Sequence, residues 1–152
     1  MHSTEVQAGR TFIVVLEHGD DFFRSLTTFC DANGIAQAYV PMFIAGFGSA
    51  DVVGTCELLE DPQAPVWSRV QLRNLEAMGA GTVVREDDGT VAPHVHVSVG
   101  LKEHSATAHT SHLLGTTVQF LTEMVLVEIV APSIVRRRDP RLYDVPLLRF
   151  GS

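Results

Sequence analysis

The sequence predicts an α+β protein in which a mostly antiparallel central sheet is flanked by a few helices. Residues 91–101 alternate between small apolar and polar side chains, which is typical of a half-buried strand. Residues 116–130 form the longest β-branched segment and are largely apolar on both parities, which indicates a central strand covered on both sides. Apolar residues at helical spacing follow Asp20 and Asp21. Because strands outnumber helices along the chain, we expect a strand-dominated α+β order.

The first part of the chain is predicted to contain a strand, a helix and a second strand. Residues 12–16 are a short apolar run and are expected to form a buried strand. Asp20 is the expected N-cap of the helix, and Asn33-Gly34 is its expected C-terminal stop. The expected apolar face of this helix consists of Phe22, Phe23, Leu26, Phe29 and Cys30. A long strand is predicted over 35–47, in which Pro41 indicates a sheet edge or a bulge.

Glycine, proline and polar residues are expected to divide the middle of the chain into shorter strands. Gly46-Phe47-Gly48-Ser49 is interpreted as a turn, and Gly79-Ala80-Gly81 as a break between two strands. Strands are expected at 52–59, 67–77 and 81–85, with loops or turns at 61–65, 86–89 and 103–110. Pro132 is expected to end the strand at 116–130.

The composition is that of one ordered globular domain. The chain has 152 residues, of which 45% are hydrophobic and 19% charged, enough apolar material to bury a core. It has no apolar run of membrane-spanning length, and its first nine residues do not resemble a signal peptide, so the cytoplasm is the expected compartment. Cys30 and Cys56 are interpreted as buried small hydrophobes, because two cysteines without close spacing predict neither a disulfide framework nor a thiolate zinc site.

The charge balance argues against binding to nucleic acid phosphates. The formal net charge is −7, whereas proteins that bind phosphates present a basic surface. One local basic cluster consists of Arg136, Arg137, Arg138 and Arg141. We interpret it as a solvated charged loop, with a contact to an anion or a partner as the alternative.

Three histidines carry the strongest functional signal. His94 and His96 share one parity of the 91–101 strand, so their side chains are expected about 7 Å apart along one face. Two imidazoles at this spacing and a third ligand, with one position left to water, make the arrangement of a catalytic zinc. His112 is the preferred third ligand, with His104 and His109 as alternatives. A chance His-x-His pair on a structural strand is the competing interpretation, because the chain contains seven histidines.

Several short motifs, in this order, resemble the PPC domain, the plant and prokaryote conserved domain. They are Leu16 to Asp21, Gly46 to Ser49, Leu75 to Gly79, Pro93-His94-Val95-His96-Val97, Ser111-His112-Leu113 and Glu123 followed by Arg138-Asp139. The resemblance covers about residues 10–150 and implies a single domain preceded by a short tail at 1–9. The usual Gly-Gly-His-Leu of this family is Thr110-Ser111-His112-Leu113 here, so the histidine is kept and the glycines are not.

The resemblance implies a fold similar to that of acetolactate decarboxylase, a homotrimer, and a metal ion held by His94, His96 and His112. The expected ion is zinc or another divalent transition metal. The preferred hypothesis is a metal-binding protein or metal-dependent enzyme that acts on a small substrate, such as an oxo-acid or an ester. Glu123, or less favourably Glu76, would then be the general acid/base or the partner of a ligand histidine.

The alternatives are a DNA-associated protein and a trimeric interaction module without catalysis. The sequence lacks the Arg-Gly-Arg-Pro run of an AT-hook and a helix-turn-helix signal. Three copies would carry a formal charge of 3 × (−7) = −21, which repels phosphates. We therefore do not expect the isolated chain to bind DNA tightly.

Overall fold

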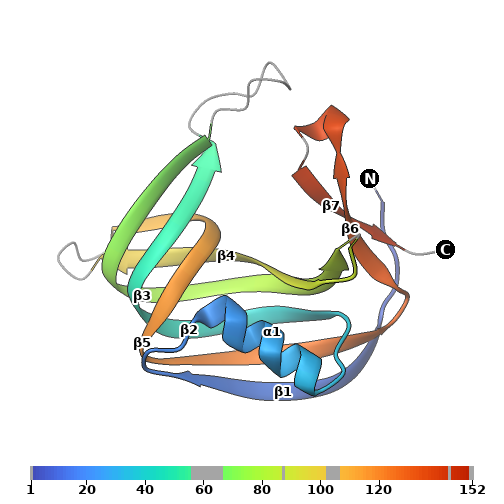
Figure 1. The fold of residues 1–152 in the computed structure, drawn as a ribbon, viewed down its shortest axis with the longest axis horizontal. Helices are drawn as coiled ribbons and strands as arrows, with labels where there is room; N and C mark the ends of the chain where they lie inside the picture. Colours follow the sequence, from blue (N-terminus) through green and yellow to red (C-terminus); the bar gives the residue numbers. More distant parts are fainter. Residues whose placement is uncertain (1, 56–66, 87, 102–106, 144, 151–152) are drawn as a thin grey trace.

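The computed structural model describes residues 2–55, 67–86, 88–101, 107–143 and 145–150 (Figure 1). Its elements, in chain order, are β1 (Gln7–Glu17), α1 (Phe22–Ala32), β2 (Ala38–Thr55), β3 (Trp67–Glu86), β4 (Val91–Leu101), β5 (Ala108–Ala131), β6 (Ile134–Asp139), the short 3-10 helix η1 (Pro140–Leu142) and β7 (Val145–Phe150). The predicted loop at 61–65, together with Cys56 and His104, lies outside the described residues.

Four long strands close into a barrel. β2 pairs with β3 and β5, and β4 pairs with the same two strands, so the hydrogen-bonded ring β2-β3-β4-β5 returns to its start. β1 adds to the outside of β5, and β6 and β7 extend from β3. The pairings are antiparallel except for the short contact between β3 and β6.

The predicted α+β class is therefore wrong, and the fold is mostly β. Among the described residues α1 is the one α-helix, with 11 residues, whereas β2, β3 and β5 have 18, 20 and 24. The described part of the structure has fewer helices than the prediction, and its strands are longer because glycines that were interpreted as turns or breaks lie within them. Gly46 and Gly79 lie inside continuous strands, where the neighbouring chain leaves no room for a side chain. A Cβ at Gly79 would lie 2.5 Å from the carbonyl oxygen of His96, so glycine here permits close packing.

The barrel interior and the inner face of α1 form one hydrophobic core. Phe22, on α1, packs against Phe43 and Phe47 of β2 with ring centroids 5.2 and 5.9 Å apart. Leu26 and Cys30, one and two turns further along α1, are fully buried. Phe23 and Phe29 lie at the edge of this core and are partly buried. The predicted apolar face of the helix is thus correct, with its centre on Phe22, Leu26 and Cys30.

Capping residues determine both ends of α1. The N-cap is Asp21, whose carboxylate accepts a hydrogen bond from the backbone N–H of Arg24. The prediction of Asp20 was one residue early, since its carboxylate instead accepts from the backbone N–H of Glu17. Asn33 is the C-cap, and Gly34 follows with a φ of 66°, as the sequence predicted.

Several other predicted boundaries are confirmed, whereas residues 108–110 of the predicted loop belong to β5. Pro41 lies at a bulge, because the pairing of β2 shifts on both sides of it. Gly89 donates to the carbonyl oxygen of Glu86 in the tight turn before β4. β5 ends at Ala131, directly before Pro132. No helix among the described residues has the length and apolar character that a membrane crossing requires.

One side of the sheet carries exposed apolar side chains, which we call the outer apolar face. It consists of Ile13, Val15, Met42, Ile44, Met78 and Leu121. The predictions of a buried first strand and of a central strand covered on both sides are wrong for this face. Ile13 is 72% exposed and Met78 is 62% exposed. The alternation in β1 and β5 therefore buries only one of their two faces within this chain.

Candidate metal site

The pairing of β4 with β5 brings three histidines together. His96 lies directly opposite His112 on the neighbouring strand, and His94 is two positions along β4 on the same face. The opposite face of β4 is anchored by Val95, Val97 and Val99, which are buried in the core as the alternation predicted.

Small residues in β3 fix the position of this strand. Gly79 and Gly81 lie against the carbonyl oxygens of His96 and His94, each of which would be 2.5 Å from an added Cβ. The Gly-Ala-Gly segment therefore lets β3 and β4 approach closely at the two histidines.

The imidazole nitrogens of His94, His96 and His112 converge. When one ring nitrogen is taken from each histidine, the three nitrogens all lie within 4.8 Å of one another. The rings of His94 and His96 are stacked, with centroids 5.2 Å apart, and the centroid of His112 lies 4.6 Å from that of His94. Three neutral imidazoles in such a cluster form a donor set that suits zinc and similar transition metals.

Burial and nearby positive charge hold two of these histidines in the neutral form. Burial, followed by the charge of Arg136, lowers the pKa of His94 to about 4. The pKa of His112 is also lowered, mainly by burial and then by His96 and Arg136. Because a metal binds the neutral imidazole, His94 and His112 stay in their metal-binding form at lower pH than an ordinary histidine.

A buried donor atom without a partner supports the fit of a metal. Nδ1 of His112 is buried and has no hydrogen-bond partner among the described residues. A buried polar atom in this state is costly unless something binds it, and a metal ion would do so. His109 does not share the cluster, because it pairs with Val99 and lies three positions from His112, on the other face of β5.

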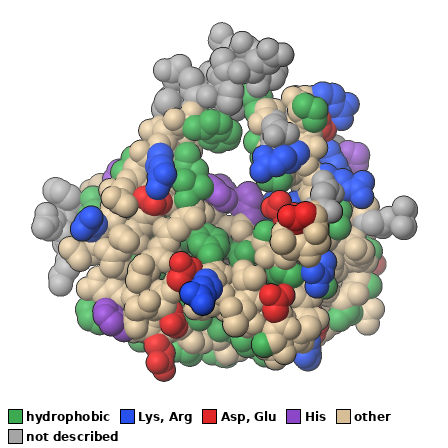
Figure 2. Space-filling model, viewed as in Figure 1, with side chains coloured by type: hydrophobic (Ala, Val, Ile, Leu, Met, Phe, Trp, Pro, Cys, Tyr) green, Lys and Arg blue, Asp and Glu red, His purple; other side chains and the backbone are tan. Residues whose placement is uncertain are grey.

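The cluster opens into a cavity of about 710 Å³. Its apolar walls include Val53, Trp67, Leu114, Val145 and Pro146, and its polar lining adds Ser111, Arg138 and Tyr143. Figure 2 shows histidine side chains at the base of an opening between the β2–β3 hairpin and the arm formed by β6 and β7. A volume of this size accommodates a small organic molecule.

The arginine cluster is part of this site, and the prediction of a solvated loop is wrong. Residues 134–139 form β6, in which Arg136 is buried and Arg138 faces the cavity. Arg136 donates to Oγ1 of Thr82 at 2.5 Å and to the carbonyl oxygen of Pro146 at 3.2 Å. Sequence reasoning missed this because β6 has only six residues, three of them arginine, which hides the alternation of buried and exposed positions.

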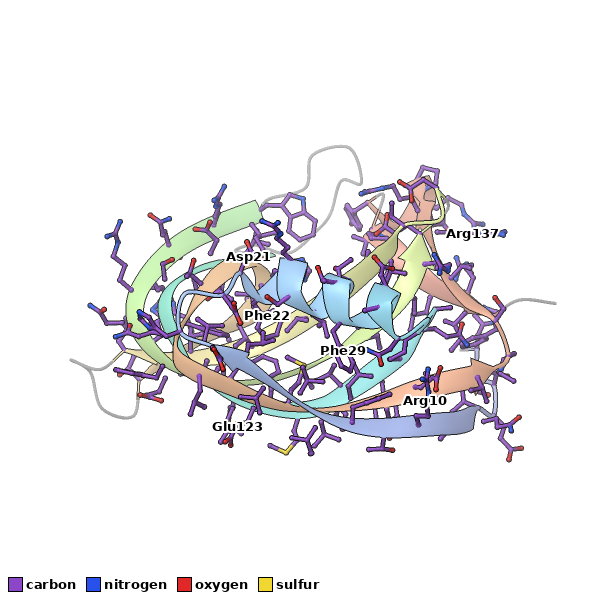
Figure 3. The ribbon with its side chains drawn as sticks, turned by 60° about the horizontal axis from the view of Figure 1, so that its bottom comes forward. Arg10, Asp21, Phe22, Phe29, Glu123 and Arg137 are labelled. Carbon is purple, nitrogen blue, oxygen red and sulfur yellow. The ribbon has the colours of Figure 1, made fainter. Side chains whose placement is uncertain are left out.

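Glu123 lies away from the three histidines. It is exposed on β5, eleven positions from His112, between Val15 of β1 and Ile44 of β2. Figure 3 shows it on the side of the sheet away from α1. Glu76 is also exposed, and neither carboxylate lines the cavity. The structure therefore does not bring Glu123 or Glu76 to the histidine cluster.

The comparisons with known proteins agree on one family. The model of the Plants and Prokaryotes Conserved (PCC) domain matches residues 3–130. No curated protein sequence matches the chain.

Solved structures with the same fold include three prokaryotic proteins. A plant- and prokaryote-conserved protein of Pyrococcus horikoshii is 24% identical, with a TM-score of 0.80, over 98% of this chain and 97% of its own. A metal-containing protein of Archaeoglobus fulgidus is 21% identical, with a TM-score of 0.80, over 97% and 98%. A Ralstonia eutropha protein, named a putative DNA-binding protein, is 21% identical, with a TM-score of 0.76, over 91% and 90%. At these identities the likeness shows the fold.

Proposed function

The chain belongs to the Plants and Prokaryotes Conserved (PCC) domain family, and from this premise we propose that it is a metal-binding protein whose His94, His96 and His112 hold a zinc-type ion. The observation that carries the proposal is the convergence of three imidazole nitrogens within 4.8 Å at the base of a cavity. The proposal is supported by Nδ1 of His112, which is buried and has no hydrogen-bond partner in the described part of the chain. A fold neighbour from Archaeoglobus fulgidus is described as metal-containing.

The cavity composition favours reversible binding of a small molecule over catalysis by a carboxylate acid or base. A zinc ion with three histidine ligands keeps an open position, where it can polarise a carbonyl group or lower the pKa of bound water. General acid–base chemistry would usually add a carboxylate or another titratable group within hydrogen-bond reach. The described residues that line the cavity include one further titratable side chain, that of Tyr143, but no Asp or Glu. Their contribution is to hold the ion, orient a ligand with Arg138 and shield it with apolar walls.

Zinc is expected to raise the melting temperature of the metal-free protein. A ligand that binds only the folded state at about 1,000 times its Kd adds about 4 kcal/mol of stability. The measurement is thermal unfolding of chelator-treated protein with and without zinc, with magnesium as a control because it prefers oxygen ligands. An unchanged melting temperature at zinc concentrations well above that of the protein would contradict the proposal.

The chain is also proposed to self-associate as a homotrimer through its outer apolar face. Across the sheet Val15, Glu123, Ile44 and Met78 lie in one cross-strand row, so the apolar side chains are contiguous except for one carboxylate. Contiguous exposed apolar surface of this kind marks association sites. The resemblance to the PPC domain implies three copies, and burial of this face between copies would remove it from water.

Substitution of Ile44 by aspartate is expected to break the trimer. Aspartate at position 44 would place a second carboxylate directly opposite Glu123 in the buried interface, where a charge costs more than in water and like charges repel. The molar mass from light scattering should be about three times 16.6 kDa for the wild type and near 16.6 kDa for Ile44→Asp. Val6→Asp is the matched control, because Val6 is 45% exposed and precedes β1. A monomeric wild type, or a trimeric Ile44→Asp, would contradict this interface.

Association with DNA is the second candidate function, because the Ralstonia eutropha neighbour carries that name. The charge balance argues against DNA binding by the isolated chain, because the chain has 11 basic and 18 acidic side chains. Arg136, the first residue of the basic cluster, is buried and hydrogen-bonded. We expect binding to an A·T-rich duplex to vanish by physiological salt in a fluorescence anisotropy titration. Sub-micromolar affinity at about 150 mM salt, where non-specific binding is normally weaker, would favour the DNA-associated function instead.

A further inference from the structure

We propose that the cavity above the histidines binds a small organic carboxylate, with its charged end toward the metal and Arg138 and its carbon chain against the apolar walls. This inference rests on the proposed metal site and names the class of molecule that the site accepts. It follows from the charge, the shape and the lining of the cavity.

The charge of the site calls for an anion. Three neutral imidazoles leave the full double positive charge of a zinc-type ion uncompensated. The cavity lining adds the guanidinium of Arg138, which also has an interaction partner within the chain, and the described lining includes no Asp or Glu. An excess of positive charge in a cavity is stabilised by an anionic ligand. The positive charge of the ion and Arg138 is thus opposite in sign to the net charge of −7 on the whole chain.

A second cation, the buried Arg136, lies close to the site. Arg136 is only 7% exposed and donates to Thr82, the residue that pairs with His94 across β3 and β4. Its other donor group bonds the carbonyl oxygen of Pro146, which lines the cavity. Nε of Arg136 is buried without a partner among the described residues. Two arginines of one strand therefore contribute positive potential, Arg136 beside Thr82 and Arg138 in the cavity wall, and the carboxylate of Glu86 offsets part of the charge of Arg136.

The size and the walls of the cavity indicate an organic anion. A volume of about 710 Å³ would be left mostly empty by an inorganic ion. Trp67, Leu114 and Val145 offer apolar surface to a carbon chain. Phosphate sites usually gather several arginines, a glycine-rich loop or a helix N-terminus. The described lining has one arginine and no residue of α1, so a carboxylate fits it better than a phosphate.

Isothermal titration of the zinc-loaded protein with hexanoate tests the inference. Hexanamide controls for the charge, acetate for the carbon chain, and inorganic phosphate for the type of anion. Hexanoate should bind, and acetate should bind about 16- to 250-fold more weakly, because each of four methylenes contributes about two- to fourfold. Hexanamide should bind at least about tenfold more weakly, since it lacks the charge-assisted contacts.

Two neighbouring arginines provide a matched pair of variants. Arg138→Ala should weaken hexanoate binding by about tenfold or more, the usual effect of losing a hydrogen bond to a charged group. Arg137→Ala should leave the affinity within about twofold, because Arg137 does not line the cavity and points away from it in Figure 3. Equal losses in both variants would overturn the role of Arg138.

The zinc content of each sample is measured by mass spectrometry before the titration. Zinc-loaded protein that does not bind hexanoate, or that binds phosphate more tightly, would overturn this inference and leave the metal site intact. Wild-type protein that takes up no zinc would overturn the proposed function and this inference together. Hexanoate binding that depends on both zinc and Arg138 would support both.

Discussion

Replacement of His96 by alanine is expected to lower the affinity for zinc by more than about 100-fold. Loss of a residue that only supports a metal ligand costs about 10- to 100-fold, so loss of a ligand itself should cost more. His96 lies opposite His112 and stacks on His94, so its removal leaves two imidazoles at an open cavity. Because His96 is exposed, the fold should not depend on it. The measurement is a competition titration of metal-free protein against a chromogenic chelator.

His109→Ala is the matched control for this variant. His109 lies on β5, as His112 does, but on the opposite face of the strand, so its loss should leave zinc affinity unchanged. The melting temperatures of both metal-free variants should stay close to that of the wild type. Zinc binding by His96→Ala at wild-type affinity would show that the ion is held elsewhere.

Replacement of Leu26 by alanine is expected to lower the free energy of unfolding by about 2–5 kcal/mol. Leu26 is fully buried where α1 packs into the core, between Phe22 and Cys30 of the same face. The substitution removes buried methyl groups and leaves a cavity that the rigid barrel cannot close. The measurement is urea unfolding of the metal-free protein at one fixed chain concentration, since association also affects stability.

Thr28→Ala on the same helix is the control for this loss. Thr28 is exposed, so its replacement should change the free energy of unfolding by no more than about 0.5 kcal/mol. A loss below about 1 kcal/mol for Leu26→Ala would place this side chain outside the core.

Local patterns predicted the helix and the histidine strand because each signal depends on neighbours in sequence. The capping carboxylate, the apolar spacing and Asn33-Gly34 predicted both ends of α1 to within one residue. The alternation in β4 assigned the valines to the core and the histidines to the other face. The strand lengths were underestimated because Gly46 and Gly79, judged from their sequence neighbours alone, were interpreted as turns. Their role is set by chain segments far away in sequence, which approach the glycine backbone closely.

The clustering of the three histidines could be predicted from the sequence, but the surroundings of the cluster could not. The two-residue spacing of His94 and His96 requires a shared face, and the pairing of β4 with β5 then places His112 opposite. The role assigned to Glu123 assumed that a carboxylate in an apolar strand needs a buried partner. The outer apolar face leaves Glu123 in contact with solvent, so that premise does not hold within one chain. Nothing in three consecutive arginines distinguishes the buried Arg136 from the exposed Arg137 and Arg138.

The metal content of the native chain, purified without a histidine tag or chelator, tests the central claim most directly. Inductively coupled plasma mass spectrometry measures every candidate metal at once, with the protein concentration obtained by amino-acid analysis. The account predicts close to one zinc-type ion per chain for the wild type, because the three histidines form one site. Wild-type protein that contains essentially no transition metal, and takes up none from added zinc, would contradict it.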